Sequence, residues 1–139
     1  MANILIYTDG ASRGNPGRSA SGFNILQNKV SIKSDVVDNK VTTNNIAEHI
    51  AIYAALKWCI ENINQPENTQ IKLYSDSELA IKQINGVYKI KDPALKKIAN
   101  KSLLLTRSFK SIKFYNVRRE NKEIAFVDRM LNIYLDSLE

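Results

Sequence analysis

The sequence predicts a mixed α/β domain built on a five-stranded sheet that is flanked by helices. Three observations support this class. The chain opens with an apolar run that is typical of a buried strand. Two further strand-like segments follow it directly, and segments with helical periodicity then alternate with two more short strands. The first three strands are therefore expected to be antiparallel, and the later ones, which follow helical crossovers, parallel to the first.

The first strand is expected over Ile4–Asp9, where the apolar run ends on a carboxylate. A loop of small residues, Gly10–Gly17, should follow, and its backbone could approach a ligand closely. The segments Ser21–Gln27 and 30–32 should form a hairpin around Asn28-Lys29, with a later turn at Asp38–Lys40.

The remaining segments alternate between helix and strand. Polar residues at Thr42–Asn45 offer caps for a helix from Ile46 to about Asn62. The later elements are expected in this order: a strand at Ile71–Ser75, a helix at Ser77–Ile84, a helix from Pro93 to about Leu105, a strand at Ile112–Val117 and a helix from about Asn121 to Leu138.

Length and composition narrow the class further. A chain of 139 residues is expected to form one domain, residues 1–139. The sequence shows no membrane-length apolar run and no secretory signal pattern, so we expect a cytoplasmic protein that is not secreted. The single cysteine, Cys59, cannot form a disulfide framework and should be a buried thiol.

Positive charge is concentrated in one part of the chain. The net charge is +6, yet residues 82–122 hold twelve basic and two acidic residues, a net of +10, which leaves −4 for the rest. This asymmetry indicates a polyanionic partner, although an ordinary solvated basic face is the alternative.

Three acids stand out by their positions in the predicted elements. Asp9 ends the first strand, Asp76 follows a second strand, and Glu48 lies about one turn into the first long helix. Taken singly, Glu48 could be a surface acid and Asp76 a helix cap. Together they form a carboxylate cluster that needs a compensating cation, and oxygen ligands suit Mg²⁺. Such a site suits metal-assisted phosphodiester hydrolysis.

These motifs resemble the type 1 ribonuclease H family over essentially the whole chain. The resemblance rests on Tyr7–Gly10 with Gly14–Gly17, Thr42–Asn45 with Ala47-Glu48, Ser75–Ser77, and Val127–Arg129. It implies an RNase H-like fold and a metal set of Asp9, Glu48, Asp76 and Asp128. The spacing before Asp128 differs from the family's usual pattern. Two alternatives are therefore open: Glu123 takes the place of Asp128, or there is no fourth ligand.

The chain is most similar to the forms of the family that lack a basic handle and the active-site-loop histidine. Its only histidine, His49, follows Glu48 and is expected to be a structural helix residue. In the loop before the last helix, Arg118 and Arg119 could contact phosphate instead.

The resemblance also implies an RNA–DNA hybrid as substrate. Reading RNA requires contact with 2′-hydroxyls across a wide minor groove. We expect such contacts from residues of the small-residue loop and of the helix start: Ser12, Gly14, Asn15, Thr43, Asn44 and Asn45.

The predicted function is therefore an endoribonuclease that hydrolyses the RNA strand of hybrids with two Mg²⁺ ions, for which Mn²⁺ could substitute, and leaves 5′-phosphate and 3′-hydroxyl ends. The protein is expected to be a monomer with no obligate protein partner. A catalytically weak or inactive hybrid-binding module of the same fold is the first alternative, and a nuclease of the same fold acting on DNA is the second.

Overall fold

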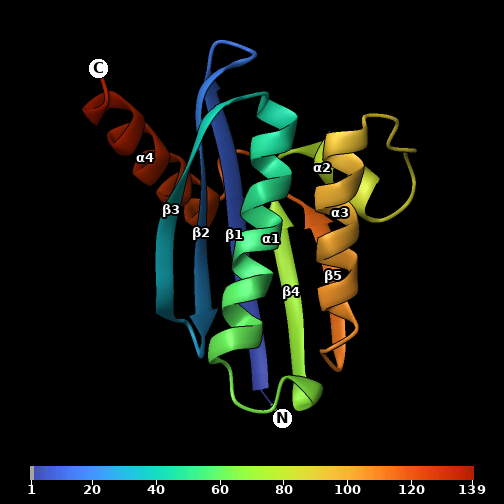
Figure 1. The fold of residues 1–139 in the computed structure, drawn as a ribbon. Helices are drawn as coiled ribbons and strands as arrows, with labels where there is room; N and C mark the ends of the chain where they lie inside the picture. Colours follow the sequence, from blue (N-terminus) through green and yellow to red (C-terminus); the bar gives the residue numbers. More distant parts are fainter. Residues whose placement is uncertain (1) are drawn as a thin grey trace.

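A computed structural model describes residues 2–139 and shows a five-stranded sheet in the order β3-β2-β1-β4-β5 (Figure 1). The strands are β1 (Ala2–Arg13), β2 (Gly17–Gln27), β3 (Val30–Thr42), β4 (Thr69–Ser75) and β5 (Ser111–Asn116). The β1–β2 and β2–β3 pairs are antiparallel, and β1–β4 and β4–β5 are parallel. The predicted sheet is confirmed.

Helices cover both faces of this sheet, as Figure 1 shows. They are α1 (Asn44–Asn62), α2 (Glu78–Ile84), α3 (Pro93–Thr106) and α4 (Lys122–Ser137), with a short 3-10 turn at Pro66–Asn68. Helix α1 packs on β1 and β2 with α3 beside it, and α4 packs on β1 and β2 from the opposite face.

The main core lies between the sheet and α1. Alternate residues of β1, such as Ile4 and Ile6, point into it and meet Ile52 and Leu56 of α1. Cys59 belongs to the same cluster and is fully buried, as expected. This packing fixes the position of α1 over the middle of β1, and with it the height of Glu48 above the sheet.

The first strand is longer than its apolar run predicted. It continues past Asp9 to Arg13, because β2 supplies a pairing partner as far as Arg13↔Arg18. Parallel pairing with β4 stops earlier, at Thr8↔Ser75. Asp9 therefore lies inside β1, at the point where β4 ends, and the expected loop is reduced to a tight turn after Arg13. Gly14 takes a φ of +91° in that turn.

The turn predicted at Asp38–Lys40 is instead a bulge within β3. Ala20 pairs with Asp38 and Ser19 with Lys40, so one residue of β3 is left over. Lys40 has a φ of +60°, and its N–H donates to Asp38 Oδ1 at 2.7 Å. The residues that predicted a turn do mark an irregularity of the backbone, but β3 continues through it. The hairpin turn at Asn28-Lys29 is confirmed, with φ values of 53° and 65°.

Across residues 2–139, none of the helices combines the length and the hydropathy that crossing a membrane requires.

Candidate functional site

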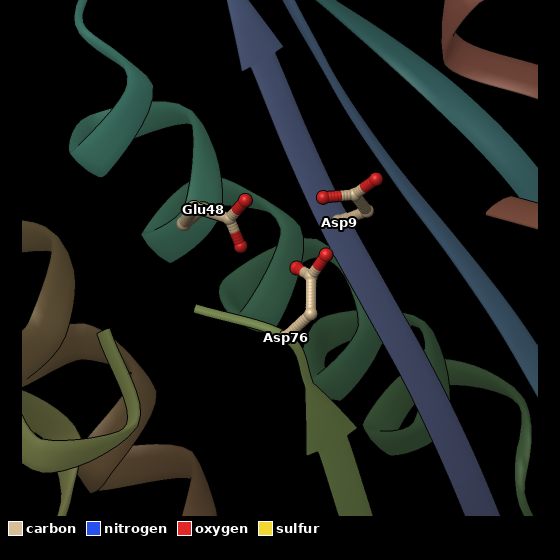
Figure 2. A group of neighbouring side chains, drawn as sticks. All are labelled: Asp9, Glu48 and Asp76. Atoms are coloured by element: carbon tan, nitrogen blue, oxygen red, sulfur yellow. The ribbon is translucent and has the colours of Figure 1, made fainter. Parts of the chain in front are cut away.

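Three carboxylates from three different elements converge at one end of the sheet. Asp9 comes from β1, Glu48 from α1 and Asp76 from the residue after β4, and Figure 2 shows their side chains turned toward one another. One oxygen from each lies within 4.8 Å of the others. Asp9 and Glu48 are only 5% and 7% exposed. Such closeness of buried acids is unfavourable unless protons or cations compensate it.

Gly10 makes this convergence sterically feasible. A Cβ at Gly10 would lie 2.5 Å from the backbone of Ala47 and Glu48, which is too close for any side chain. The missing side chain lets α1 rest directly on β1. The Gly10 N–H then donates to Asp9 Oδ1 at 2.9 Å and to Glu48 Oε1 at 3.0 Å.

Ser75 supports the cluster from the opposite side. Its hydroxyl donates to Glu48 Oε2 at 3.3 Å and accepts the Ser77 N–H at 3.0 Å. Glu48 is thus held by one backbone donor and one hydroxyl, and its orientation is fixed before any ligand binds.

The pKa values of all three acids are raised, chiefly because burial disfavours the charged form. For Asp9, the neighbouring charges of Glu48 and Asp76 raise the pKa further. For Asp76, the positive charge of Arg119 partly offsets the effect of burial on the pKa. A bound proton or cation therefore stabilises the cluster, because it reduces the repulsion between the carboxylates.

A hard divalent cation fits this donor set. The oxygens come from carboxylates, they lie close together, and their mutual repulsion is relieved when a cation binds.

Asp128 lies on α4 and lines the same cleft as the three clustered acids, although it is exposed. Its charge raises the pKa values of both Asp9 and Asp76. Glu123 lies elsewhere: it lines a separate hollow and accepts a 3.4 Å hydrogen bond from Asn24 Nδ2. Of the two candidates for a fourth acid, only Asp128 shares the cleft.

The turn after β1 and the start of α1 are joined by a set of hydrogen bonds. Asn44 Oδ1 accepts from the Ser12 N–H at 2.9 Å and from the Ser12 hydroxyl at 2.8 Å. Asn15 Oδ1 accepts the Asn44 N–H at 3.0 Å. These three residues line the cleft, which has a volume of about 480 Å³.

The other predicted contact residues take different positions. Asn45 lines the cleft, and its buried Oδ1 has no hydrogen-bond partner within residues 2–139. Thr43 caps α1, with its hydroxyl accepting the Ile46 N–H at 3.2 Å. Gly14 lies in the turn, where its carbonyl accepts from the Ser12 hydroxyl. Neither Thr43 nor Gly14 is among the residues that line the cleft.

The two loop arginines lie at the border of the cleft. Arg119 lines it together with Asp76 and Asp128. Arg118 lines the neighbouring hollow, which Arg119 and Asp76 also border. Both are exposed. His49, by contrast, is fully buried in α1, where its Nε2 lies 3.0 Å from Gln83 Oε1.

Several contributors to the site were not singled out from the sequence. Ser75 belongs to a motif that was recognised, but its bond to Glu48 depends on how β4 and α1 pack. Ser77, which belongs to the same motif, also lines the cleft. Leu79 lines it too, and no sequence signal marks this exposed apolar residue.

Comparison with known proteins gives a consistent result. The family model described as RNase H matches residues 1–128. Ribonuclease HI of Halobacterium salinarum is 34% identical over 134 residues, which cover 96% of this chain and 64% of that protein. The bifunctional protein Rv2228c of Mycobacterium tuberculosis is 28% identical over 138 residues, covering 96% of this chain and 36% of that protein. The chain thus spans less than two thirds of the length of these curated relatives.

Solved structures match over almost their whole length. RNase H1 of Halobacterium salinarum aligns with a TM-score of 0.87 and 29% identity, covering 97% of this chain and 98% of that one. LC11-RNase H1 in complex with an RNA/DNA hybrid aligns with a TM-score of 0.88 and 32% identity, over 97% and 98%. With the sheet order and the acid cluster already described, the chain belongs to the RNase H family.

Proposed function

We propose that this chain is an endoribonuclease that hydrolyses the RNA strand of RNA–DNA hybrids and leaves 5′-phosphate and 3′-hydroxyl ends. The observation that carries the proposal is the convergence of Asp9, Glu48 and Asp76 at a cleft whose rim carries hydroxyl and amide groups. The solved relative whose complex holds an RNA/DNA hybrid supports the choice of substrate.

The acids would hold two Mg²⁺ ions, with Mn²⁺ as a substitute. Asp9, Glu48, Asp76 and Asp128 are the residues that would hold these ions. When bound, such ions supply an activated water and stabilise the leaving oxygen. The protein contributes preorganisation: Gly10 and Ser75 hold Glu48 in place, and the cleft holds the strand against the acids.

The rim of the cleft is proposed to distinguish RNA from DNA. Asn44 is hydrogen-bonded to both Ser12 and Asn15, which holds these three residues together. They form an edge that can exchange hydrogen bonds with a 2′-hydroxyl. Asn45 adds an acceptor that has no partner within the described chain. Gly14 shapes the turn, and Thr43 could hold a phosphate at the start of α1.

The arginines are proposed to contact phosphates of the bound strand. Arg119 borders the acid cluster, and Arg118 lies one residue farther out. We expect no selection by base sequence, so binding should depend on phosphates and shape.

One cleavage assay tests this proposal. The parent protein is given the same sequence as an RNA–DNA hybrid, duplex DNA and duplex RNA, each end-labelled, with Mg²⁺. We expect cleavage of the hybrid RNA strand only. Comparable cleavage of duplex DNA would indicate a DNA nuclease, and hybrid binding without cleavage would indicate a binding module; either result contradicts the proposal.

A further inference from the structure

Three tyrosines form a row across the sheet on one face. Tyr7, Tyr74 and Tyr115 are direct neighbours in the pairing of β1, β4 and β5. Their rings stack in sequence, with centroids 5.0 Å apart for Tyr7 and Tyr74 and 5.5 Å apart for Tyr74 and Tyr115. Because β5 is the edge of the sheet, no further strand of residues 2–139 lies beside the outer ring face of Tyr115, and Tyr115 is 38% exposed.

Two exposed lysines lie in the next row of the same face. Leu5, Lys72 and Lys113 are neighbours across the three strands and lie two residues before the tyrosines, so they point to the same side. All three line a hollow of about 540 Å³. Helix α4 packs on β1 and β2 and lies well away from β5, which leaves this half of the face open (Figure 1).

The tyrosine row is continuous with the candidate site. Asp9 and Asp76 lie two residues beyond Tyr7 and Tyr74, roughly 7 Å along the strands at the usual rise per residue. A nucleic-acid strand that leaves the cleft at this end would therefore meet the tyrosines first and the lysines next.

We propose that this open face binds a single-stranded nucleic-acid tail that extends from the hybrid held in the cleft; the proposal rests on the function proposed above. Lys72 and Lys113 would contact phosphates of the tail, and one base would stack on the outer face of Tyr115. Glu123 is the acidic group that faces Tyr7 from α4, and it lies at the end of the row remote from Tyr115.

Charge and continuity together favour this occupant. The lysines require an anionic partner, and a polyanion is already expected in the adjoining cleft. Aromatic rings beside positive charges are the usual elements of single-strand binding, in which any base can stack. An acidic protein segment would match the lysines, but it would have no reason to begin at the edge of the catalytic cleft.

The test compares blunt hybrids with hybrids of the same duplex that carry a single-stranded tail of about ten nucleotides, a length within the usual range of such sites. Tails are placed on either strand and at either end. The KM for cleavage is measured with Mg²⁺, and binding is measured by fluorescence anisotropy without metal. For one tail polarity, we expect the parent to bind the tailed hybrid about fivefold more tightly than the blunt one.

Two double variants and one single variant identify the surface. Lys72→Gln/Lys113→Gln and Tyr115→Ala should each lose most of the tail advantage. Lys33→Gln/Lys57→Gln removes the same amount of charge, but from β3 and α1, and this variant should keep the tail advantage. Cleavage of the blunt hybrid should stay within about twofold of the parent in every variant, because none of these residues lines the cleft.

The outcomes separate this inference from the proposed function. Equal binding of tailed and blunt hybrids, or a tail advantage that survives in Lys72→Gln/Lys113→Gln, would overturn the inference while blunt-hybrid cleavage continues. A protein that cleaves no hybrid would contradict the proposed function instead, and the anisotropy measurement would still decide whether a tail is bound.

Discussion

The backbone N–H of Gly10 donates to Oε1 of Glu48 across 3.0 Å, and this bond joins the strand that carries Asp9 to the helix that carries Glu48. The contact exists only because position 10 has no side chain. The spacing of the two acids is thus set by direct backbone packing of β1 against α1.

Gly10→Ala should therefore damage both stability and activity. The new Cβ would lie 2.5 Å from the Ala47 backbone, so α1 must move away from β1. We expect a loss of about 2 kcal/mol or more in the free energy of unfolding, measured by urea denaturation, because backbone atoms cannot yield as a flexible side chain can. Hybrid cleavage should fall at least about 100-fold, since the acids no longer converge.

Gly86→Ala is the matched control for this substitution. A Cβ at Gly86 would meet no atom of the described residues within 4 Å, but Gly86 has a φ of +78°. This variant should lose only about 1 kcal/mol, the cost of the left-handed conformation, and should keep its cleavage rate. A Gly10→Ala protein as active and as stable as the Gly86→Ala protein would refute the steric explanation.

Asp9→Asn should stabilise the metal-free protein at neutral pH. Burial and Glu48 raise the pKa of Asp9 in the folded state above its unfolded value, so the folded state binds more protons. The contribution of Asp9 to stability is therefore complete below the unfolded pKa, near 4, and is lost as the pH rises through the folded pKa.

Urea denaturation in EDTA checks this expectation. The stability advantage of Asp9→Asn over the parent should grow steadily between pH 4.5 and pH 8, by at most about 1.4 kcal/mol per pH unit. Mg²⁺ should reduce that advantage by stabilising the parent alone. If the advantage stays constant with pH, burying the charged form of Asp9 does not destabilise the folded protein, and the expectation is wrong.

Asp128→Asn and Glu123→Gln distinguish the two candidates for the fourth acid. Asp128 shares the cleft with the three clustered acids, whereas Glu123 lies in a separate hollow beside Asn24. We expect kcat on the hybrid to fall about 100-fold in Asp128→Asn and less than about twofold in Glu123→Gln. The reverse order would assign the role to Glu123, and two unaffected variants would mean that no fourth acid is needed.

Asn45→Ala tests the rim of the cleft. The buried Oδ1 of Asn45 lacks a partner within the described residues, so its removal leaves the folded protein no less stable. If substrate supplies the partner, KM for the hybrid should rise about tenfold while the free energy of unfolding stays the same. A fall in stability with an unchanged KM would instead make Asn45 a structural residue.

Much of the fold could be predicted because its signals are local. The apolar run of β1, the Asn28-Lys29 hairpin turn and the polar cap of α1 each follow from a few adjacent residues. The length of β1 could not be predicted, since the small residues after Asp9 stay in the strand only because β2 pairs with them. The residues at the bulge in β3 are typical of a turn, and the strand continues through them only because β2 pairs with β3 on both sides of the bulge.

The acids of the site could be selected from sequence, but their support could not. Asp9, Glu48 and Asp76 were marked by strand ends and motif spacing. The bonds from Gly10 and Ser75 to Glu48 depend on the distance between the sheet and α1, which is a tertiary property. The tyrosine row was equally hidden, because Tyr7, Tyr74 and Tyr115 are brought together only by the register of three strands.

The cleavage rate of Asp9→Asn beside that of the parent tests whether the acid cluster carries out hybrid cleavage. Both proteins are given the same labelled RNA–DNA hybrid with Mg²⁺, and circular dichroism establishes that both are folded. We predict that the parent cuts the RNA strand to 5′-phosphate and 3′-hydroxyl ends, whereas folded Asp9→Asn binds the hybrid without cutting it. Mg²⁺-dependent cleavage by Asp9→Asn at the parent rate would mean that hybrid cleavage does not depend on the acid cluster.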